Sequence, residues 1–117
     1  MIKLKNDEYR RVRGGKAFMI HIYCSRCNNK ILYYQKDGDG PLKRCYLNRI
    51  FWPKEFEKLQ YNKTLSHPNT IPALICPQCQ TVIGKAILHH DGRMAFRLRP
   101  GFCFKKRDTD VTRKENK

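Results

Sequence analysis

Apolar and polar residues alternate along two short segments of the chain, residues 16–23 and residues 94–99. Every second residue in these segments is apolar, and these residues are Phe18, Ile20, Ile22, Met94, Phe96 and Leu98. Because successive side chains of a strand point to opposite faces, this alternation predicts two strands that each bury one face. In the second segment the opposite face carries Arg97 and Arg99 and is expected to be exposed.

Four further segments are rich in β-branched and aromatic residues and predict shorter strands. They are residues 31–36, 42–50, 81–88 and 102–104. The sequence Asp-Gly-Asp-Gly-Pro at residues 37–41 is a strong turn signal and predicts a hairpin between the first two of these strands. The Asp-Gly pair within residues 90–93 predicts another hairpin, which joins residues 81–88 to residues 94–99.

A short helix is predicted at residues 53–59, because Pro53 suits the first helical position and charged residues follow it. Residues 60–72 contain several Asn and Pro residues and predict a loop. Together these elements predict a mainly β protein, with a small antiparallel sheet and one short helix.

Two Cys-x-x-Cys pairs, Cys24 with Cys27 and Cys76 with Cys79, add candidate chemistry to this pattern. A two-residue gap lets one tight turn bring both sulfurs to a single ion, and structural Zn²⁺ sites take four thiolates in tetrahedral geometry. We therefore expect these four cysteines to bind one structural Zn²⁺ ion. Iron is the other metal that a four-cysteine site can hold.

Redox pairs and disulfides fit the cysteine pattern less well than a metal site does. A thioredoxin-like redox pair belongs at the start of a helix in a βαβ unit, whereas each pair here lies between predicted strands. Disulfides are typical of secreted proteins, and the first residues of the chain lack the apolar region of a secretory signal. Cys45 and Cys103 stand outside the paired pattern and are interpreted as free thiols within the core.

The stretches at residues 22–32 and 75–86 resemble the zinc-ribbon superfamily, in which strand, Cys-x-x-Cys knuckle and strand occur twice. The resemblance implies a zinc-ribbon-like sheet with a long insertion between the two knuckles. A site closed by four cysteines leaves no position for water or substrate, so the metal is expected to be structural. Since no catalytic constellation is visible elsewhere, the chain is not expected to be an enzyme, and no small-molecule substrate is evident.

The chain has 25 Lys and Arg residues against 10 Asp and Glu residues, a formal net charge of +15. Such an excess favours a polyanionic partner. The pattern predicts three regions: a flexible basic arm at residues 1–15, a single zinc-ribbon-like domain at residues 16–106 and a charged, disordered tail at residues 107–117. No segment is apolar enough to span a membrane, and we expect a cytoplasmic protein.

The basic segments predict binding of nucleic acid, because Lys and Arg neutralise phosphates and release counterions. The candidate nucleic-acid-binding residues are Arg10, Arg11, Arg13, Lys16, Arg97, Arg99, Lys105, Lys106 and Arg107. Aromatic residues lie among these and other charges, namely Tyr33, Tyr34, Tyr46, Phe102 and Phe104. If exposed, they could stack on unpaired bases, which favours RNA or single strands; if buried, they are core residues. The alternative function is a zinc-ribbon adaptor that docks on an acidic protein surface in a larger assembly.

Overall fold

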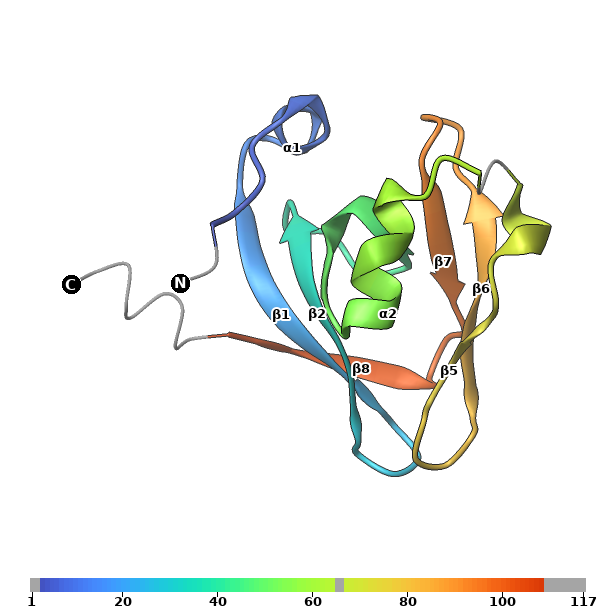
Figure 1. The fold of residues 1–117 in the computed structure, drawn as a ribbon. Coiled ribbons are helices and arrows are strands. Elements are labelled where there is room, and N and C mark those ends of the chain that lie inside the picture. The colour runs from blue at the N-terminus through green and yellow to red at the C-terminus, as the bar shows by residue number, and fades with distance from the viewer. Residues whose placement is uncertain (1–2, 65–66, 109–117) are drawn as a thin grey trace.

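The two halves of the fold are a pair of four-stranded antiparallel sheets (Figure 1). A computed structural model of the chain describes residues 3–64 and residues 67–108. The first sheet has the order β4-β2-β1-β8, formed by β1 (Ala17–Cys24), β2 (Lys30–Asp37), β4 (Ile50–Trp52) and β8 (Cys103–Arg107). The second has the order β3-β7-β6-β5, formed by β3 (Arg44–Tyr46), β5 (Leu74–Ile75), β6 (Val82–Leu88) and β7 (Met94–Leu98). The prediction of a mainly β protein is thus confirmed.

Two short α-helices and three 3-10 turns complete the described part of the chain. The helices are α1 (Glu8–Val12) and α2 (Lys54–Glu57), and the turns cover Leu47–Arg49, Lys58–Tyr61 and Pro68–Thr70. Helix α2 begins directly after Pro53 and continues into the second turn, which confirms the helix predicted at residues 53–59. Among the described residues, no helix has the length and apolar character needed to cross a membrane.

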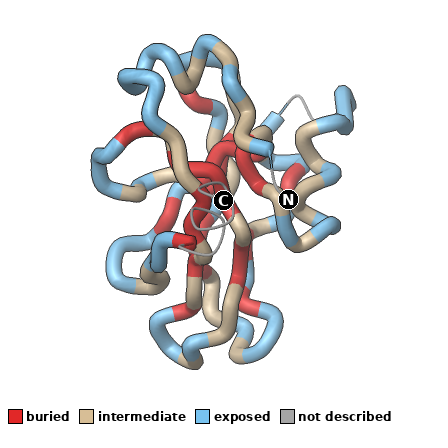
Figure 2. Tube along the Cα trace, turned by 90° about the vertical axis from the view of Figure 1, so that its left-hand side faces the viewer, coloured by how far each residue is buried: buried red, intermediate tan, exposed pale blue. Residues whose placement is uncertain are grey.

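The core lies between the two sheets and receives side chains from both. Ile20 and Ile22 of β1, Leu32 of β2 and Phe96 of β7 have no exposed surface. Figure 2 shows the buried residues at the centre of the trace, with exposed residues in the surrounding loops. The alternation predicted for β1 and β7 therefore does bury one face of each strand.

The segment at residues 42–50 does not form the single strand that its composition predicts. It divides into β3, the turn Leu47–Arg49 and the start of β4, and it makes no hairpin with β2. Instead β3 pairs with β7, and β4 returns to pair with β2 through Ile50 and Tyr34. The physical reason is the burial of successive side chains, since nearly every side chain from Cys45 to Ile50 is buried. A strand with one exposed face would bury only every second side chain, whereas a segment that crosses between two sheets can bury them all.

The second predicted hairpin is confirmed. Strands β6 and β7 pair antiparallel, and Gly92 in the turn between them has a φ of 91°, a backbone conformation that residues with a Cβ rarely adopt. Gly84 of β6 meets a different constraint, because a Cβ there would lie 2.6 Å from the Arg97 carbonyl oxygen. The short strand predicted at residues 102–104 is found as β8, which runs further, to Arg107, along the edge of the first sheet.

The segment predicted as a flexible basic arm contains a helix where it is described, from Lys3 onward. Asp7 caps α1 by accepting hydrogen bonds from the N–H groups of Tyr9 and Arg10. The same carboxylate pairs with the buried side chain of Arg49, so the segment is held against the sheets. Of the predicted tail, residues 109–117 lie outside the described residues.

Candidate metal centre and basic surfaces

The two Cys-x-x-Cys pairs occupy the tips of two hairpins, one from each sheet. Cys24 is the last residue of β1 and Cys27 lies in the turn before β2, whereas Cys76 and Cys79 both lie between β5 and β6. Figure 1 shows the two tips side by side at the bottom of the molecule. The four Sγ atoms lie within 4.8 Å of one another, with Cys24 at 3.6 Å from Cys79 and Cys27 at 3.5 Å from Cys76.

The two knuckles have the same backbone geometry. In each, the N–H of the first cysteine donates to the carbonyl five residues later, and the N–H four residues later donates back to the carbonyl of that cysteine, all at 2.9 Å. Asn28 and Gln80 occupy equivalent positions with φ of 63° and 66°, the left-handed conformation that closes the turn. The repeat means that two separate segments present sulfur atoms in the same way.

The environment of the thiols favours ionisation at one position and opposes it at another. The hydroxyl and N–H of Thr81 lower the pKa of Cys79 to about 6. The N–H of Asn29 also lowers the pKa of Cys27, but partial burial and the three neighbouring cysteines raise it to about 12 overall. Because neighbouring thiolates repel one another, a cation is needed for all four to ionise together.

The cluster fits a tetrahedral metal ion. With a metal–sulfur bond of about 2.3 Å, tetrahedral ligands lie about 3.8 Å apart, close to the separations found here. Cys24 and Cys76 are fully buried, whereas Cys27 and Cys79 are partly exposed. The four cysteines are therefore placed to hold one metal ion where the two sheets meet, as the spacing predicts.

Cys45 and Cys103 lie outside this cluster. Cys45 is fully buried in the core, as predicted, and burial raises the pKa of its thiol. Cys103 is half-buried and faces Cys24 across the β1–β8 pair, where burial also raises the pKa of its thiol. Neither one extends the site to a fifth or sixth ligand.

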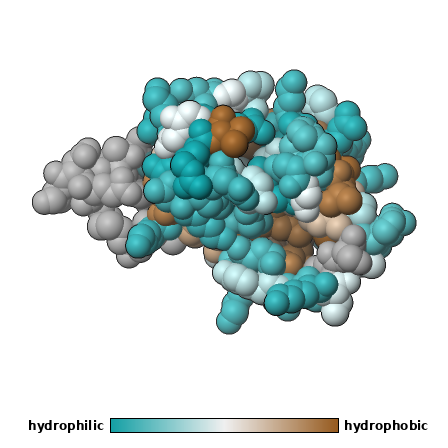
Figure 3. Space-filling view, turned by 90° about the horizontal axis from the view of Figure 1, so that it is seen from above, coloured by the Kyte–Doolittle hydropathy of each residue, from teal (hydrophilic) through white to brown (hydrophobic). Residues whose placement is uncertain are grey.

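The nine basic residues predicted to bind nucleic acid come from three separate segments of the chain. Arg10, Arg11, Arg13 and Lys16 lie in or just after α1, Arg97 and Arg99 at the end of β7, and Lys105, Lys106 and Arg107 in β8. Within β8, Lys106 pairs with His21 and points to the face opposite its two neighbours. Viewed from above, the molecule presents a mostly hydrophilic surface with separate apolar patches (Figure 3).

One group of cations is brought together by strand register. Arg97 of β7 lies directly opposite Arg44 of β3 on one side and Lys85 of β6 on the other. We call these three residues the basic row. In the described ranges none of them lies within 4.0 Å of a carboxylate oxygen. The sequence could not show this row, because it depends on which strands pair and in what register.

The outer side of the first sheet carries an aromatic surface. Trp52, Tyr33, His21 and Lys106 form one register row across all four strands, and Tyr23 pairs with Phe104 beside it. We call the five rings the aromatic face: His21, Tyr23, Tyr33, Trp52 and Phe104. The His21 and Tyr33 rings stack at 4.8 Å between centroids, and those of Tyr23 and Phe104 at 5.3 Å. Asp108 lies at its edge, where its carboxylate accepts a hydrogen bond from Tyr33.

Lysine side chains lie on the aromatic face. The Lys30 ammonium is 4.8 Å from the centre of the Trp52 ring, and that of Lys106 is 5.7 Å from the Tyr23 ring. Trp52 is 45% exposed and the other four rings are half-buried. Of the aromatic residues that the sequence offered for stacking, Tyr33 and Phe104 are on this face, whereas Tyr34 and Tyr46 are buried.

The N-terminal segment explains why only part of this side of the sheet remains open. Met19 pairs with Gln35 on the same side, and both are buried. The Lys5 backbone exchanges hydrogen bonds of 2.7 and 2.8 Å with the Gln35 amide and so covers that half.

Comparison of the chain with protein-family models, with curated proteins and with solved structures finds no match.

Proposed function

We propose that this chain is a zinc-ribbon-type protein that binds nucleic acid without catalysing a reaction, and that its ligand is RNA or another single strand. The observation that carries the proposal is the basic row of Arg44, Arg97 and Lys85. Like charges directly opposite one another in a sheet lower stability. A polyanion reverses this cost, because its phosphates neutralise the row and release counterions.

The aromatic face favours the binding of single strands over the binding of duplexes. In a duplex the bases are stacked on one another, whereas unpaired bases can stack on exposed rings. Trp52, with 45% exposure and Lys30 above its ring, offers both a stacking surface and a positive charge for a phosphate. The two features lie on different sheets, so a strand in contact with both would have to pass around the molecule.

Zinc is the metal that the donor set favours. Four thiolates in tetrahedral geometry suit Zn²⁺, and a closed structural site contributes directly to folding. In zinc-finger peptides this contribution is on the order of 10 kcal/mol, comparable to the whole stability of a small domain. Reduced thiols of this kind are kept in compartments such as the cytoplasm, which is the location we propose.

Fluorescence anisotropy with a labelled single-stranded RNA and a duplex DNA, over a salt series, tests this function. We expect the single strand to bind more tightly and its affinity to fall linearly on a log–log plot against salt. The double variant Lys85→Gln/Arg97→Gln removes two charges of the basic row and should reduce the slope by about 1.4, at about 0.7 per phosphate contact.

The matched control is Lys54→Gln/Lys58→Gln, which removes two exposed lysines at α2 and should leave the slope nearly unchanged. A flat salt response, or an equal loss in this control, would contradict the proposal. Binding to polyglutamate but not to RNA would instead favour the adaptor that docks on an acidic protein.

A further inference from the structure

A cavity of about 230 Å³ lies between the end of α1, the β2–β3 connection and β3. Its charged lining consists of Arg13, Lys36, Asp37, Lys43, Arg44 and Arg93. Five cations thus line the cavity with a single carboxylate. The volume is below the roughly 300 Å³ at which sites for drug-sized ligands begin, so the cavity suits a small charged group or the end of a chain.

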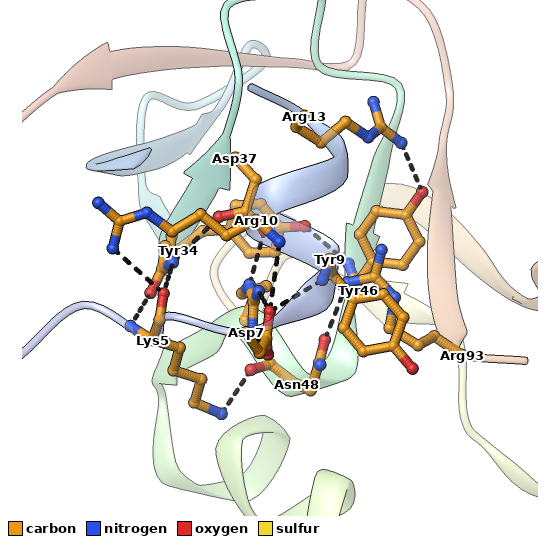
Figure 4. Close-up of polar contacts among 12 residues, drawn as sticks. Lys5, Asp7, Tyr9, Arg10, Arg13, Tyr34, Asp37, Tyr46, Asn48 and Arg93 are labelled. Atoms are coloured by element: carbon orange, nitrogen blue, oxygen red, sulfur yellow. Dashed lines mark hydrogen bonds and ion pairs between the residues drawn. The ribbon is translucent and has the colours of Figure 1, made fainter. Parts of the chain in front are cut away.

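Two of these charges are already neutralised by other contacts. Arg93 pairs with Asp91 at 2.9 Å, and its guanidinium lies between the rings of Tyr9 and Tyr46 (Figure 4). The Asp37 carboxylate is occupied by Arg49 at 2.8 Å. Four cations remain that have no carboxylate within 4.0 Å in the described part of the chain: Arg13, Lys36, Lys43 and Arg44. We call this group the basic pocket.

Two arginines of the basic pocket converge on one weak acceptor. The Arg13 Nη2 and the Arg44 Nε each lie 3.3 Å from the hydroxyl oxygen of Tyr46. Figure 4 shows the Arg13 side chain reaching toward this hydroxyl from the end of α1. A guanidinium has five N–H donors, so most of the donors of both side chains are left for a ligand. Arginine pairs placed in this way are suited to the oxygens of a phosphate.

Lys36 adds an unusual buried charge. Its side chain is 5% exposed, and its ammonium donates to the Gly38 carbonyl at 2.8 Å and lies 5.9 Å from the Phe18 ring. Burial, followed by the nearby charge of Lys105, lowers the pKa of Lys36. A buried ammonium without an anionic partner is costly, and an anion in the cavity would offset that cost.

We propose that the basic pocket binds the phosphate of a phosphate monoester, such as the phosphorylated end of a nucleic-acid strand. A monoester carries close to two negative charges at neutral pH, which suits four cations better than the single charge of a backbone phosphodiester. The assignment of the phosphate to the end of a nucleic-acid strand rests on the proposed function. Arg44 belongs to both the basic pocket and the basic row. The phosphate site itself would stand without that function.

Thermal unfolding of the metal-loaded protein with inorganic phosphate, at ionic strength matched with chloride, tests the pocket directly. A ligand that binds only the native state raises the melting temperature with its concentration. The variants Arg13→Gln and Arg44→Gln should each weaken phosphate binding about tenfold or more, the usual worth of a charge-assisted hydrogen bond. Lys54→Gln, at an exposed cation of α2 outside the cavity, is the control and should keep the wild-type response.

Because Arg13 is exposed, its substitution leaves the core intact even if Arg44→Gln does not fold. Unfolding of each variant without phosphate verifies this. An equal phosphate response in wild type, Arg13→Gln and Lys54→Gln would overturn the site.

Two oligonucleotides of one sequence, with and without a 5′-phosphate, and the mononucleotide monophosphate separate the sources. We expect the phosphorylated strand to bind more tightly to wild type, and the two strands to bind alike to Arg13→Gln. If both strands bind alike to wild type and inorganic phosphate has no effect, the pocket is refuted and the proposed function stands. If phosphate and the mononucleotide bind but neither strand does, the pocket stands and nucleic-acid binding is refuted.

Discussion

Arg49 and Asp7, 42 positions apart in the chain, form a bidentate ion pair, with Nη1 at 3.0 Å from Oδ2 and Nη2 at 2.5 Å from Oδ1. Arg49 has no exposed surface, and its Nε donates to Asp37 at 2.8 Å. The same Asp7 carboxylate caps α1. One contact therefore fixes the N-terminal segment and also neutralises a charge in the core.

Asp7→Asn should destabilise the protein by about 3 kcal/mol. Removal of one partner leaves a buried charge less well compensated, and the value is at the lower end for a buried pair because Asp7 itself is partly exposed. Urea unfolding measures the change. Asp39→Asn is the control, because its pair with Lys16 is exposed and should be worth less than about 1 kcal/mol. Equal effects of the two variants would contradict this assignment.

Acid should lower the free energy of unfolding by protonating the same Asp7 carboxylate. The Arg49 guanidinium is the main cause that lowers the pKa of Asp7 to about 2. A carboxyl with a lowered native pKa stabilises the fold above its unfolded pKa of about 3.9 and loses that contribution as the pH falls toward 2. Because acid also protonates the metal ligands, the quantity to measure is the difference in unfolding free energy between wild type and Asp7→Asn. This difference should shrink between about pH 5 and about pH 2, as set by these pKa values, and a constant difference would contradict the prediction.

Removal of the metal should unfold the domain. The purified protein is expected to contain one zinc per chain by elemental analysis, and chelation should abolish its cooperative unfolding transition, since structural zinc supplies folding free energy. Iron in place of zinc would contradict the identity of the metal, and a chain that stays folded without metal would contradict its structural role.

Cysteine variants separate ligands from core thiols. Cys27→Ser should lose the metal and the fold, because it breaks the four-sulfur set. Cys45→Ser should keep the metal and lower the free energy of unfolding by about 1 to 3 kcal/mol, the cost of a buried hydroxyl without a partner. Loss of metal in both variants would indicate a second site.

Arg97→Thr should raise stability in the absence of ligand. It removes the central charge of the basic row, and opposed like charges in a sheet cost about 0.2 to 1 kcal/mol per pair. The gain in unfolding free energy should shrink at high salt, which screens the repulsion. A variant that is less stable at every salt concentration would show that Arg97 has a favourable partner.

Trp52→Ala should weaken the binding of single strands by about 1 to 3 kcal/mol, the usual worth of one stacked base. The salt slope should stay the same, because no phosphate contact is lost. Trp52 is the single tryptophan of the chain, so its fluorescence in the wild-type protein reports stacking directly. Binding of RNA without any change in this fluorescence would place the strand elsewhere.

The features that could be predicted from the sequence depend on residues close together in the chain. The two knuckles, α2 and the β6–β7 hairpin are each specified by a few neighbouring residues, such as Pro53 before α2. The cysteine cluster followed from spacing alone, since two chelating turns have few other uses.

The features that could not be predicted depend on partners distant in sequence. The segment from Cys45 to Ile50 is buried between two sheets, so its composition could not reveal a change of sheet. The order of the N-terminal segment depends on Arg49, whose partner no local pattern identifies. The basic row and the basic pocket likewise can be recognised only when the strand register and the crossings of the chain between the sheets are known.

The strands of the two sheets alternate along the chain. The first sheet takes β1, β2, β4 and β8, whereas β3, β5, β6 and β7 of the second sheet fall between them. No single cut between Lys30 and Cys103 therefore yields a fragment that holds the complete first sheet. A truncation within this range separates strands of one sheet, so functional dissection must rely on point substitutions rather than on truncated halves.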